Sequence, residues 1–205
     1  MRNRTRERTK AAVFLLESNT LSDEKLGDSE GEVLSKILHL SRVKTKYFYF
    51  RTKREFKMLL KEFQGSAFRY LHVACHGDEK GMATTFDELS FSELSEVLAP
   101  YINHRRVFFS ACAMVNTSLA RQLFRESECF SIMGPANDIY FGDAAVFWAS
   151  FYTVLLRHKA SSMSRERIVS NARVLADAFS IDLNYFGRKS NTKFRPYTFT
   201  RIRGA

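Results

Sequence analysis

The chain has 205 residues, 45% of them hydrophobic and only 9 Gly and 3 Pro, so it is long enough to bury one full core. This composition excludes a fibrous or disordered chain, and no apolar run approaches the ~20 residues that span a bilayer. Its three cysteines, Cys75, Cys112 and Cys129, are an odd number, which favours reduced thiols over a disulfide scaffold. No Cys-x-x-Cys or His-x-x-x-His spacing indicates a metal site, and we expect no metal or cofactor.

The net charge of +10 comes from the two ends of the chain. Residues 1–10 carry five bases and one acid, and residues 187–205 carry six bases and no acid. Residues 11–186 therefore hold 21 of the 32 bases and 21 of the 22 acids. We expect a basic tail at each end of a neutral domain over 11–186. Such tails can bind nucleic acid or an acidic partner. However, the sequence shows no set of aromatic residues interleaved with the basic ones that would contact nucleotide bases.

Short apolar runs alternate with segments of helical period, a pattern typical of a parallel sheet covered by helices. The first run, residues 11–17, follows basic residues but is too short for a signal-peptide core. We therefore expect a buried strand there, and a cytoplasmic protein without membrane contact. The later strands are expected at 45–50, 69–75, 106–111 and 129–133, and the stretch after Tyr185 can add a last one.

Helix starts are marked by Ser or Thr followed three positions later by Glu, the pattern of a capping box. Three such pairs occur, at Ser29–Glu32, Thr52–Glu55 and Ser90–Glu93. Residues 143–158 are apolar nearly all round and predict a buried helix, and a last helix is expected over 164–179. No repeat or linker divides the body, so we predict a single α/β domain.

Two of the expected strands end in residues whose side chains can take part in catalysis. One closes with His76-Gly77 and the next with Cys112. In open parallel sheets, catalytic groups gather beyond the carboxyl ends of the strands, and consecutive strands are often neighbours. Strand alternation places Cys75 in a packed layer and His72 deeper in the fold, as a buried, hydrogen-bonded histidine. His76 instead stands where the chain turns.

A thiol beside an imidazole is the minimum for nucleophilic acyl transfer. The imidazole can protonate the leaving amine, and the N–H groups of Gly77 and Cys112 could form an oxyanion hole. A lone cysteine at a strand end is more often a small core residue, and a histidine before glycine is often a turn residue. The joint placement of both on successive strands favours the catalytic interpretation.

The residues around both strand ends resemble the motifs of CHAT domains, a branch of the caspase-like cysteine peptidases. YLHVACHG (70–77) and VFFSAC (107–112) are similar to their His-Gly and Ser-Ala-Cys motifs. GMATTFDELSFSEL (81–94) resembles the turn, strand and helix after the histidine, and GPANDIYFGDAAVFWASFYTVLL (134–156) resembles the fifth strand exit and next helix. The resemblance runs from about residue 11 to residue 180. It implies a caspase-haemoglobinase fold, a three-layer sandwich with a mostly parallel central sheet.

The resemblance also implies a function. The chain would be a thiol endopeptidase, a hydrolase of peptide bonds, with His76 as general acid/base and Cys112 as nucleophile. Gly77 and Cys112 would supply the oxyanion donors. Two departures lie beside the site: Met114 stands where many relatives have a polar turn, and Tyr140 where many have a tryptophan.

Three further residues are candidates for supporting roles. Relatives that cut after Arg or Lys commonly have an acid two positions before the cysteine, where this chain has Ser110, which disfavours that specificity. Asp78 could orient the imidazole or contact substrate, although a solvated loop charge is the commoner case. Asp143 is expected as a helix N-terminal residue stabilised by the macrodipole, with a supporting role left open by its match to the family helix.

The expected partners are a protein or peptide substrate and a separate activating protein, docked through the basic tails. Three alternatives stay open: a catalytically silent caspase-like binding module, a nucleic-acid binder acting through the tails, and a flavodoxin- or TIR-like nucleotide binder. Against the last, no strand is followed by a Gly-rich phosphate loop.

Overall fold

The structure of the chain is a computed structural model that describes residues 9–157, 164–189 and 194–199. Its strands are β1 (Lys10–Ser18), β2 (Thr45–Tyr49), β3 (Phe68–Gly77), β4 (Gly81–Ala83), β5 (Glu88–Ser90), β6 (Arg106–Ser110), β7 (Ser131–Pro135), β8 (Leu183–Arg188) and β9 (Phe194–Phe199). Its helices are α1 (Leu21–Leu26), α2 (Glu30–Leu40), α3 (Lys53–Gly65), α4 (Phe91–Leu98), the 3₁₀ turn η1 (Ala99–Tyr101), α5 (Thr117–Glu126), α6 (Phe141–Leu156) and α7 (Arg165–Phe179).

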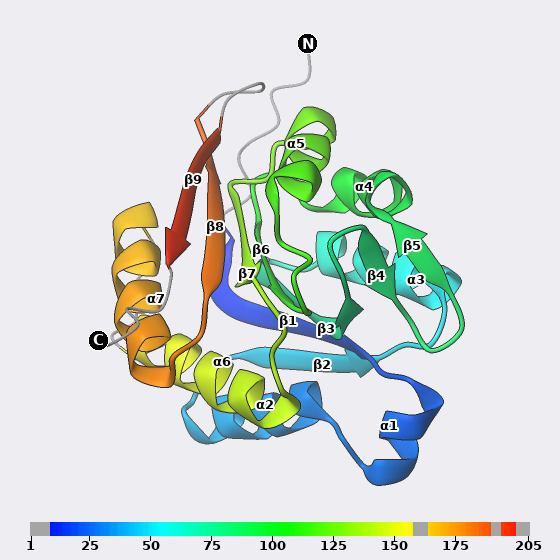
Figure 1. Cartoon of the computed structure of the whole chain (residues 1–205), viewed down its shortest axis with the longest axis horizontal. Helices are drawn as coiled ribbons and strands as arrows, with labels where there is room; N and C mark the ends of the chain where they lie inside the picture. The colour runs from blue at the N-terminus through cyan, green and yellow to red at the C-terminus, as the bar shows by residue number, and fades with distance from the viewer. Residues whose placement is uncertain (1–8, 158–163, 190–193, 200–205) are drawn as a thin grey trace.

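The strands of the described ranges form one nine-stranded sheet in the order β2-β1-β3-β6-β7-β8-β9, with β4 and β5 branching from β3 (Figure 1). Pairing is parallel from β2 to β7. It turns antiparallel where β8 joins β7 and β9 joins β8. The predicted α/β class with a mostly parallel central sheet is therefore confirmed.

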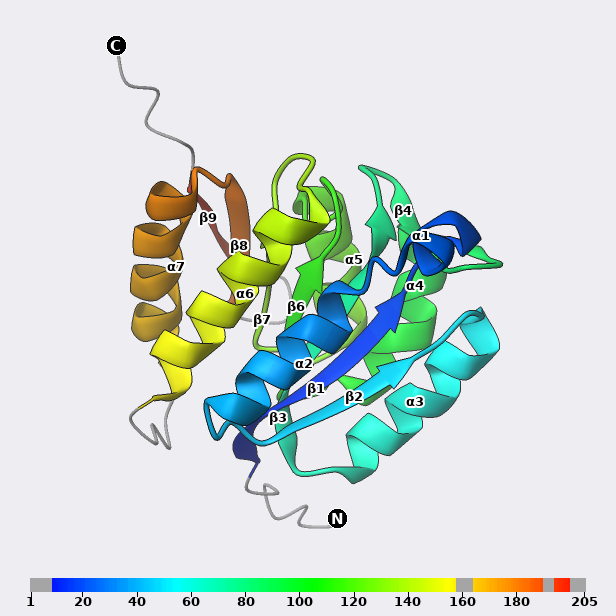
Figure 2. The same ribbon diagram turned by 90° about the horizontal axis from the view of Figure 1, so that it is seen from below.

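The sheet separates two apolar cores because successive side chains of a strand point to opposite faces. In β1, Phe14 and Leu16 pack on one side, and Val13 and Leu15 pack on the other. The first core is closed by α3, α4 and α5 and the second by α2, α6 and α7, as Figures 1 and 2 show. This arrangement is the predicted three-layer sandwich.

Two of the three predicted capping boxes are confirmed, at Thr52 and Ser90. The third is wrong. Ser29 precedes α2 as expected, but its hydroxyl donates to Glu17 Oε2 at 2.8 Å instead of capping the helix. The buried Glu17 carboxylate, from β1, also accepts the Gly31 N–H at 2.7 Å and the Tyr47 hydroxyl at 2.7 Å. A carboxylate from the sheet thus accepts the hydrogen bonds of donors at the start of α2.

Replacing Glu17 tests this anchor. Glu17→Ala leaves one buried and two partly buried donors without their acceptor and opens a cavity, so we expect the free energy of unfolding to fall by about 3 kcal/mol. The matched control is Glu32→Ala, which removes an exposed ion pair with Lys36 on the same helix and should change it by less than about 0.5 kcal/mol. Equal denaturant midpoints for the two variants would contradict the anchor.

The structure describes little of the expected N-terminal basic tail and more of the expected C-terminal one. Residues 1–8 lie outside the described residues. In the C-terminal segment, β8 reaches Arg188 and β9 adds a strand to the sheet, so part of this segment is structured. The Arg188 guanidinium donates to the carbonyls of Phe124, Ser127 and Cys129 around the end of α5. Arg188, one of the basic residues of this segment, therefore stabilises the fold.

None of the helices in the described ranges combines the length and apolar character that crossing a bilayer requires.

Candidate active site

The ends of β3 and β6 place the two predicted catalytic residues. The two strands pair in parallel up to Ala74 opposite Ser110. His76 and Cys112 each lie two residues beyond this pair, on the same edge of the sheet. The two segments that follow these strands stay close together, because a Cβ atom added at Gly77 would come within 3.2 Å of the Ala111 Cβ.

His76 is held by a carboxylate that the sequence did not reveal. Its side chain is 41% exposed, and its Nε2 lies 2.8 Å from Oδ2 of Asp23 in α1. The ring also forms a T-shaped contact with the Phe141 ring, with centroids 5.6 Å apart and planes at 81°. Partial burial alone would raise the pKa of Asp23, but the hydrogen bonds from Thr20 and His76 outweigh it and hold that pKa below its usual value. The imidazole therefore faces an ionised carboxylate at neutral pH.

Cys112 is the partly exposed one of the three cysteines, whereas Cys75 and Cys129 are buried. Burial raises the pKa of Cys75, as expected for a thiol pointing into the packed layer, and raises that of Cys129 to about 12. The Cys112 Sγ accepts the Ile139 N–H at 3.4 Å. The next residue, Ala113, has φ of 50°, a left-handed conformation that is uncommon without glycine and is concentrated at functional sites.

The backbone around the thiol leaves a donor available. Across the described ranges, the Cys112 N–H has no hydrogen-bond acceptor. Gly77, the other predicted donor, lies in the short antiparallel pairing with β4, opposite Met82. A Cβ at Gly77 would also approach the Met114 Sδ at 3.2 Å, so Met114 packs under the turn.

Two pockets lie near these residues. One of about 420 Å³ is lined by His76, Gly77 and the β4–β5 hairpin, including Met82 and Leu89. The other, of about 290 Å³, lies at the end of β7 and includes Ile139, whose backbone contacts the Cys112 thiol.

None of the three residues predicted in supporting roles forms a hydrogen bond with the His76 imidazole in the described part of the chain. Asp78 accepts the Lys80 and Gly81 N–H groups at 2.7 and 2.9 Å, so its carboxylate stabilises its own turn. Asp143 stands in the first turn of α6, as predicted, and lines the smaller pocket. Ser110 is buried and donates to Glu30 Oε2 at 2.8 Å.

Glu30 and His72 form a buried polar pair under the site. His72 is fully buried and hydrogen-bonded to the Tyr152 hydroxyl at 2.9 Å, which confirms the prediction for this histidine. Desolvation lowers the pKa of His72 to about 3. Desolvation raises the pKa of Glu30 to about 8, against the Ser110 hydrogen bond and with help from the nearby Glu17 charge. At neutral pH both side chains are therefore largely uncharged.

The sequence could have indicated α1 but not its partner. Thr20-x-x-Asp23 is a capping box with Asp in place of Glu or Gln, and both of its hydrogen bonds form. No residue of α1 is buried, so the helix lacks the apolar stripe that marks the longer helices. Only the folded chain brings Asp23 to His76. In the described ranges, no group of three His, Cys, Asp or Glu side chains is placed to hold a metal ion.

Comparison with known proteins supports the fold. No protein-family model matches the sequence, and no curated protein matches it either. The structure is similar to that of a secreted C11 cysteine protease from Bacteroides thetaiotaomicron in complex with an irreversible peptide inhibitor, with a TM-score of 0.61 and 11% identity. A second structure of a secreted C11 cysteine protease from that organism, "iotapain", gives a TM-score of 0.54 and 10% identity. Each match covers 87% of this chain and 66% of the other, so the chain spans slightly less than two thirds of their length. The fold is caspase-like.

Proposed function

We propose that this protein is a cysteine peptidase in which Cys112 is the nucleophile and His76 the general acid/base. One observation carries the proposal. A partly exposed thiol and an imidazole paired with a carboxylate follow two adjacent, paired strands at the same edge of the sheet. The caspase-like fold shared with C11 cysteine proteases supports it, as does the pocket that His76 and Gly77 line. The resemblance to CHAT domains stays a prediction.

The reaction follows from these groups. Cys112 gives its proton to His76, and the thiolate attacks the carbonyl carbon of the peptide bond. The N–H groups of Cys112 and Gly77 stabilise the resulting oxyanion. The C–N bond breaks as the imidazolium protonates the leaving amine. Water, deprotonated by His76, then cleaves the thioester and restores the thiol.

Chemical modification tests the proposal. We expect the wild-type protein to cleave a proteome-derived peptide library, with the new ends read by mass spectrometry. Iodoacetamide should modify Cys112 first, because Cys75 and Cys129 are buried and their pKa values are raised. Cleavage should fall in proportion to the modified fraction of Cys112, as measured by peptide mapping. Unchanged cleavage by protein fully modified at Cys112 would reject the assignment.

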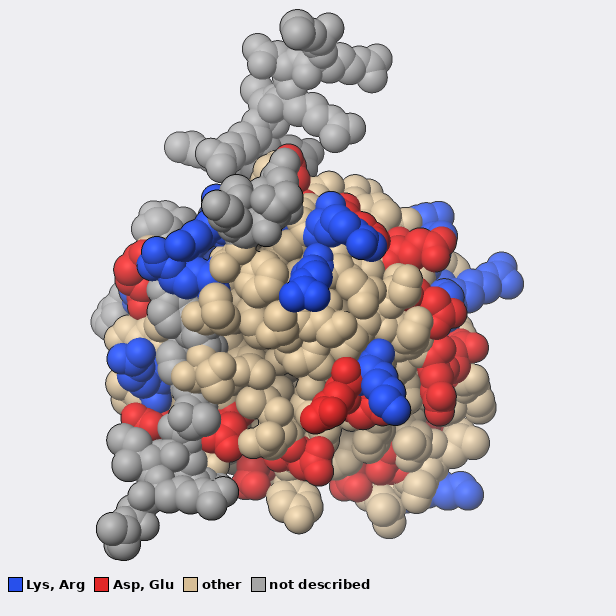
Figure 3. Space-filling model, turned by 45° about the horizontal axis from the view of Figure 1, so that its top comes forward, with Lys and Arg blue, Asp and Glu red and all other residues tan. Residues whose placement is uncertain are grey.

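Three further features of the protein are also proposals. A separate activating protein, a cytoplasmic location and the division at residues 10 and 187 rest on the sequence alone. On the face shown in Figure 3, the Lys and Arg side chains of the described residues stand apart and alternate with Asp and Glu. This face therefore offers no extended basic surface from the described residues for a nucleic-acid backbone.

A further inference from the structure

We propose that Asp23 is the positioning residue of the site: it holds His76 by Nε2 and stabilises the imidazolium that forms when Cys112 gives up its proton. This inference rests on the proposed peptidase function and adds a third residue to it. The two side chains meet at 2.8 Å, with the Asp23 side chain 16% exposed and the His76 side chain 41% exposed.

The charge of Asp23 determines the tautomer of His76. An ionised carboxylate only accepts hydrogen bonds, and the pKa of Asp23 lies below its usual value, so His76 must carry its proton on Nε2. Nδ1 then presents a lone pair, and within the described ranges it has no hydrogen-bond partner. Nδ1 is therefore the atom that accepts the thiol proton and later returns it to the leaving amine. Asp23 itself stays ionised throughout.

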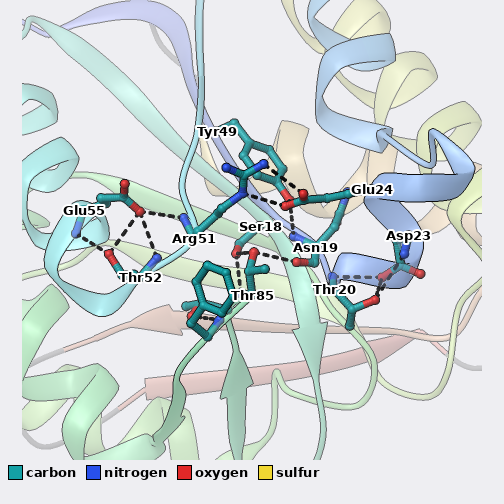
Figure 4. A network of polar contacts seen from close by, with 12 residues as sticks. Ser18, Asn19, Thr20, Asp23, Glu24, Tyr49, Arg51, Thr52, Glu55 and Thr85 are labelled. Carbon is teal, nitrogen blue, oxygen red and sulfur yellow. Dashed lines mark hydrogen bonds and ion pairs between the residues drawn. The ribbon is translucent and has the colours of Figure 1, made fainter.

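Helix α1 is short and has no buried residue, so polar contacts must position Asp23. The Thr20 hydroxyl and N–H both donate to Asp23 Oδ2, at 2.5 and 2.9 Å. Next to it, Glu24 accepts two hydrogen bonds from Arg51, at 2.8 and 2.9 Å, and one from the Tyr49 hydroxyl (Figure 4). These contacts tie α1 to the end of β2.

The same region is tied to the hairpin side of the site. Asn19, which precedes the helix, donates its N–H to Tyr49, and its carbonyl accepts the Thr85 hydroxyl at 2.7 Å (Figure 4). The Thr85 N–H in turn donates to Ser18 at the end of β1. The ends of β1 and β2 and the turn that contains Thr85 thus hold α1 in place, and α1 carries the carboxylate that faces the imidazole. A positioning residue needs this kind of rigid support.

The rate of Cys112 alkylation by iodoacetamide between pH 5.5 and 9 tests the inference without a known substrate. We expect Asp23→Asn to lower this rate, and peptide cleavage where measured, by about 10–100-fold near pH 6–7. The rates should converge with the wild type near pH 9, where the thiol ionises without help. Asp23→Glu should restore part of the loss. Asp177→Asn, the same change in an exposed carboxylate of α7 that lines neither pocket, should match the wild type throughout.

The outcomes separate this inference from the function on which it rests. A wild-type profile that depends on His76 but is unchanged by Asp23→Asn would reject the role of Asp23 alone. A loss from Asp23→Asn that is uniform at every pH would show a merely structural role and would also reject it. A profile already insensitive to His76→Ala would reject the dyad, and the role of Asp23 with it.

Discussion

Cys112→Ala is expected to abolish peptide cleavage, a loss of at least about 10⁴-fold, because no other group in the site can form the thioester. His76→Ala should cost about as much, since nucleophile and base act as one unit and their losses do not add. Cleavage of the peptide library, read as new chain ends per unit time, measures both. Circular dichroism and thermal melting check that the variants stay folded.

The matched control is Cys75→Ala. Cys75 directly precedes His76 but is buried in the packed layer, and burial raises its pKa, so it cannot replace Cys112. We expect this variant to cleave at a rate close to that of the wild type. Equal cleavage by wild type and Cys112→Ala would sink the assignment. A folded wild type that neither cleaves nor reacts with electrophilic peptide probes would favour the silent binding module.

The second large effect concerns the pH dependence of stability. The folded-state pKa of Glu30, about 8, exceeds its ordinary value of 4.5, so the stability it contributes is full below pH 4.5 and is lost as pH rises through 8. The pKa of His72 is lowered from 6.5 to about 3, so its contribution is full above pH 6.5 and is lost as pH falls toward 3. Between pH 4.5 and 6.5 the contributions of the two residues to the unfolding free energy change with pH in opposite directions. Above pH 6.5 only the loss from Glu30 remains.

We therefore expect the wild type to lose about 2 kcal/mol of unfolding free energy between pH 6.5 and 8 through Glu30. Glu30→Gln, which keeps the shape and cannot ionise, should remove this slope. Denaturant unfolding at a series of pH values measures the difference between the two proteins. Glu32→Gln, an exposed change on the same helix, should keep the wild-type slope. A Glu30→Gln variant with that same slope would show that the Glu30 pKa is not raised.

Much of the fold was predictable because its signals are local. The strands of the central sheet are short apolar runs, and each run from 11–17 to 129–133 lies in or overlaps a strand of the structure. The helices over the sheet carry apolar stripes, and Thr52 and Ser90 cap them as their spacing indicates. Alternation along β3 correctly separated Cys75 and His72 onto opposite faces. These features depend on neighbours a few residues away.

Other features depended on contacts between distant residues. Ser29 has the spacing of a capping residue, but the buried Glu17 carboxylate competes for its hydroxyl. Asp78, two positions after His76, could orient the ring, although a solvated loop charge is the commoner case; its Oδ1 instead accepts two N–H groups of its own turn. The carboxylate that contacts the ring comes from Asp23, 53 positions away. Helix α1, which carries it, is held by polar contacts and leaves no periodic signal in the sequence.

The sequence by itself determined the sandwich, the two strand ends and the pair of residues that stand there. It could do so because apolar periodicity and strand alternation are properties of short segments. Only the tertiary structure decided which carboxylate faces His76, that Ser110 turns inward to Glu30, and that His76 lines a pocket with the β4–β5 hairpin. The physical reason is that hydrogen bonds and burial depend on what the whole chain brings together, and residue order alone does not specify those distances.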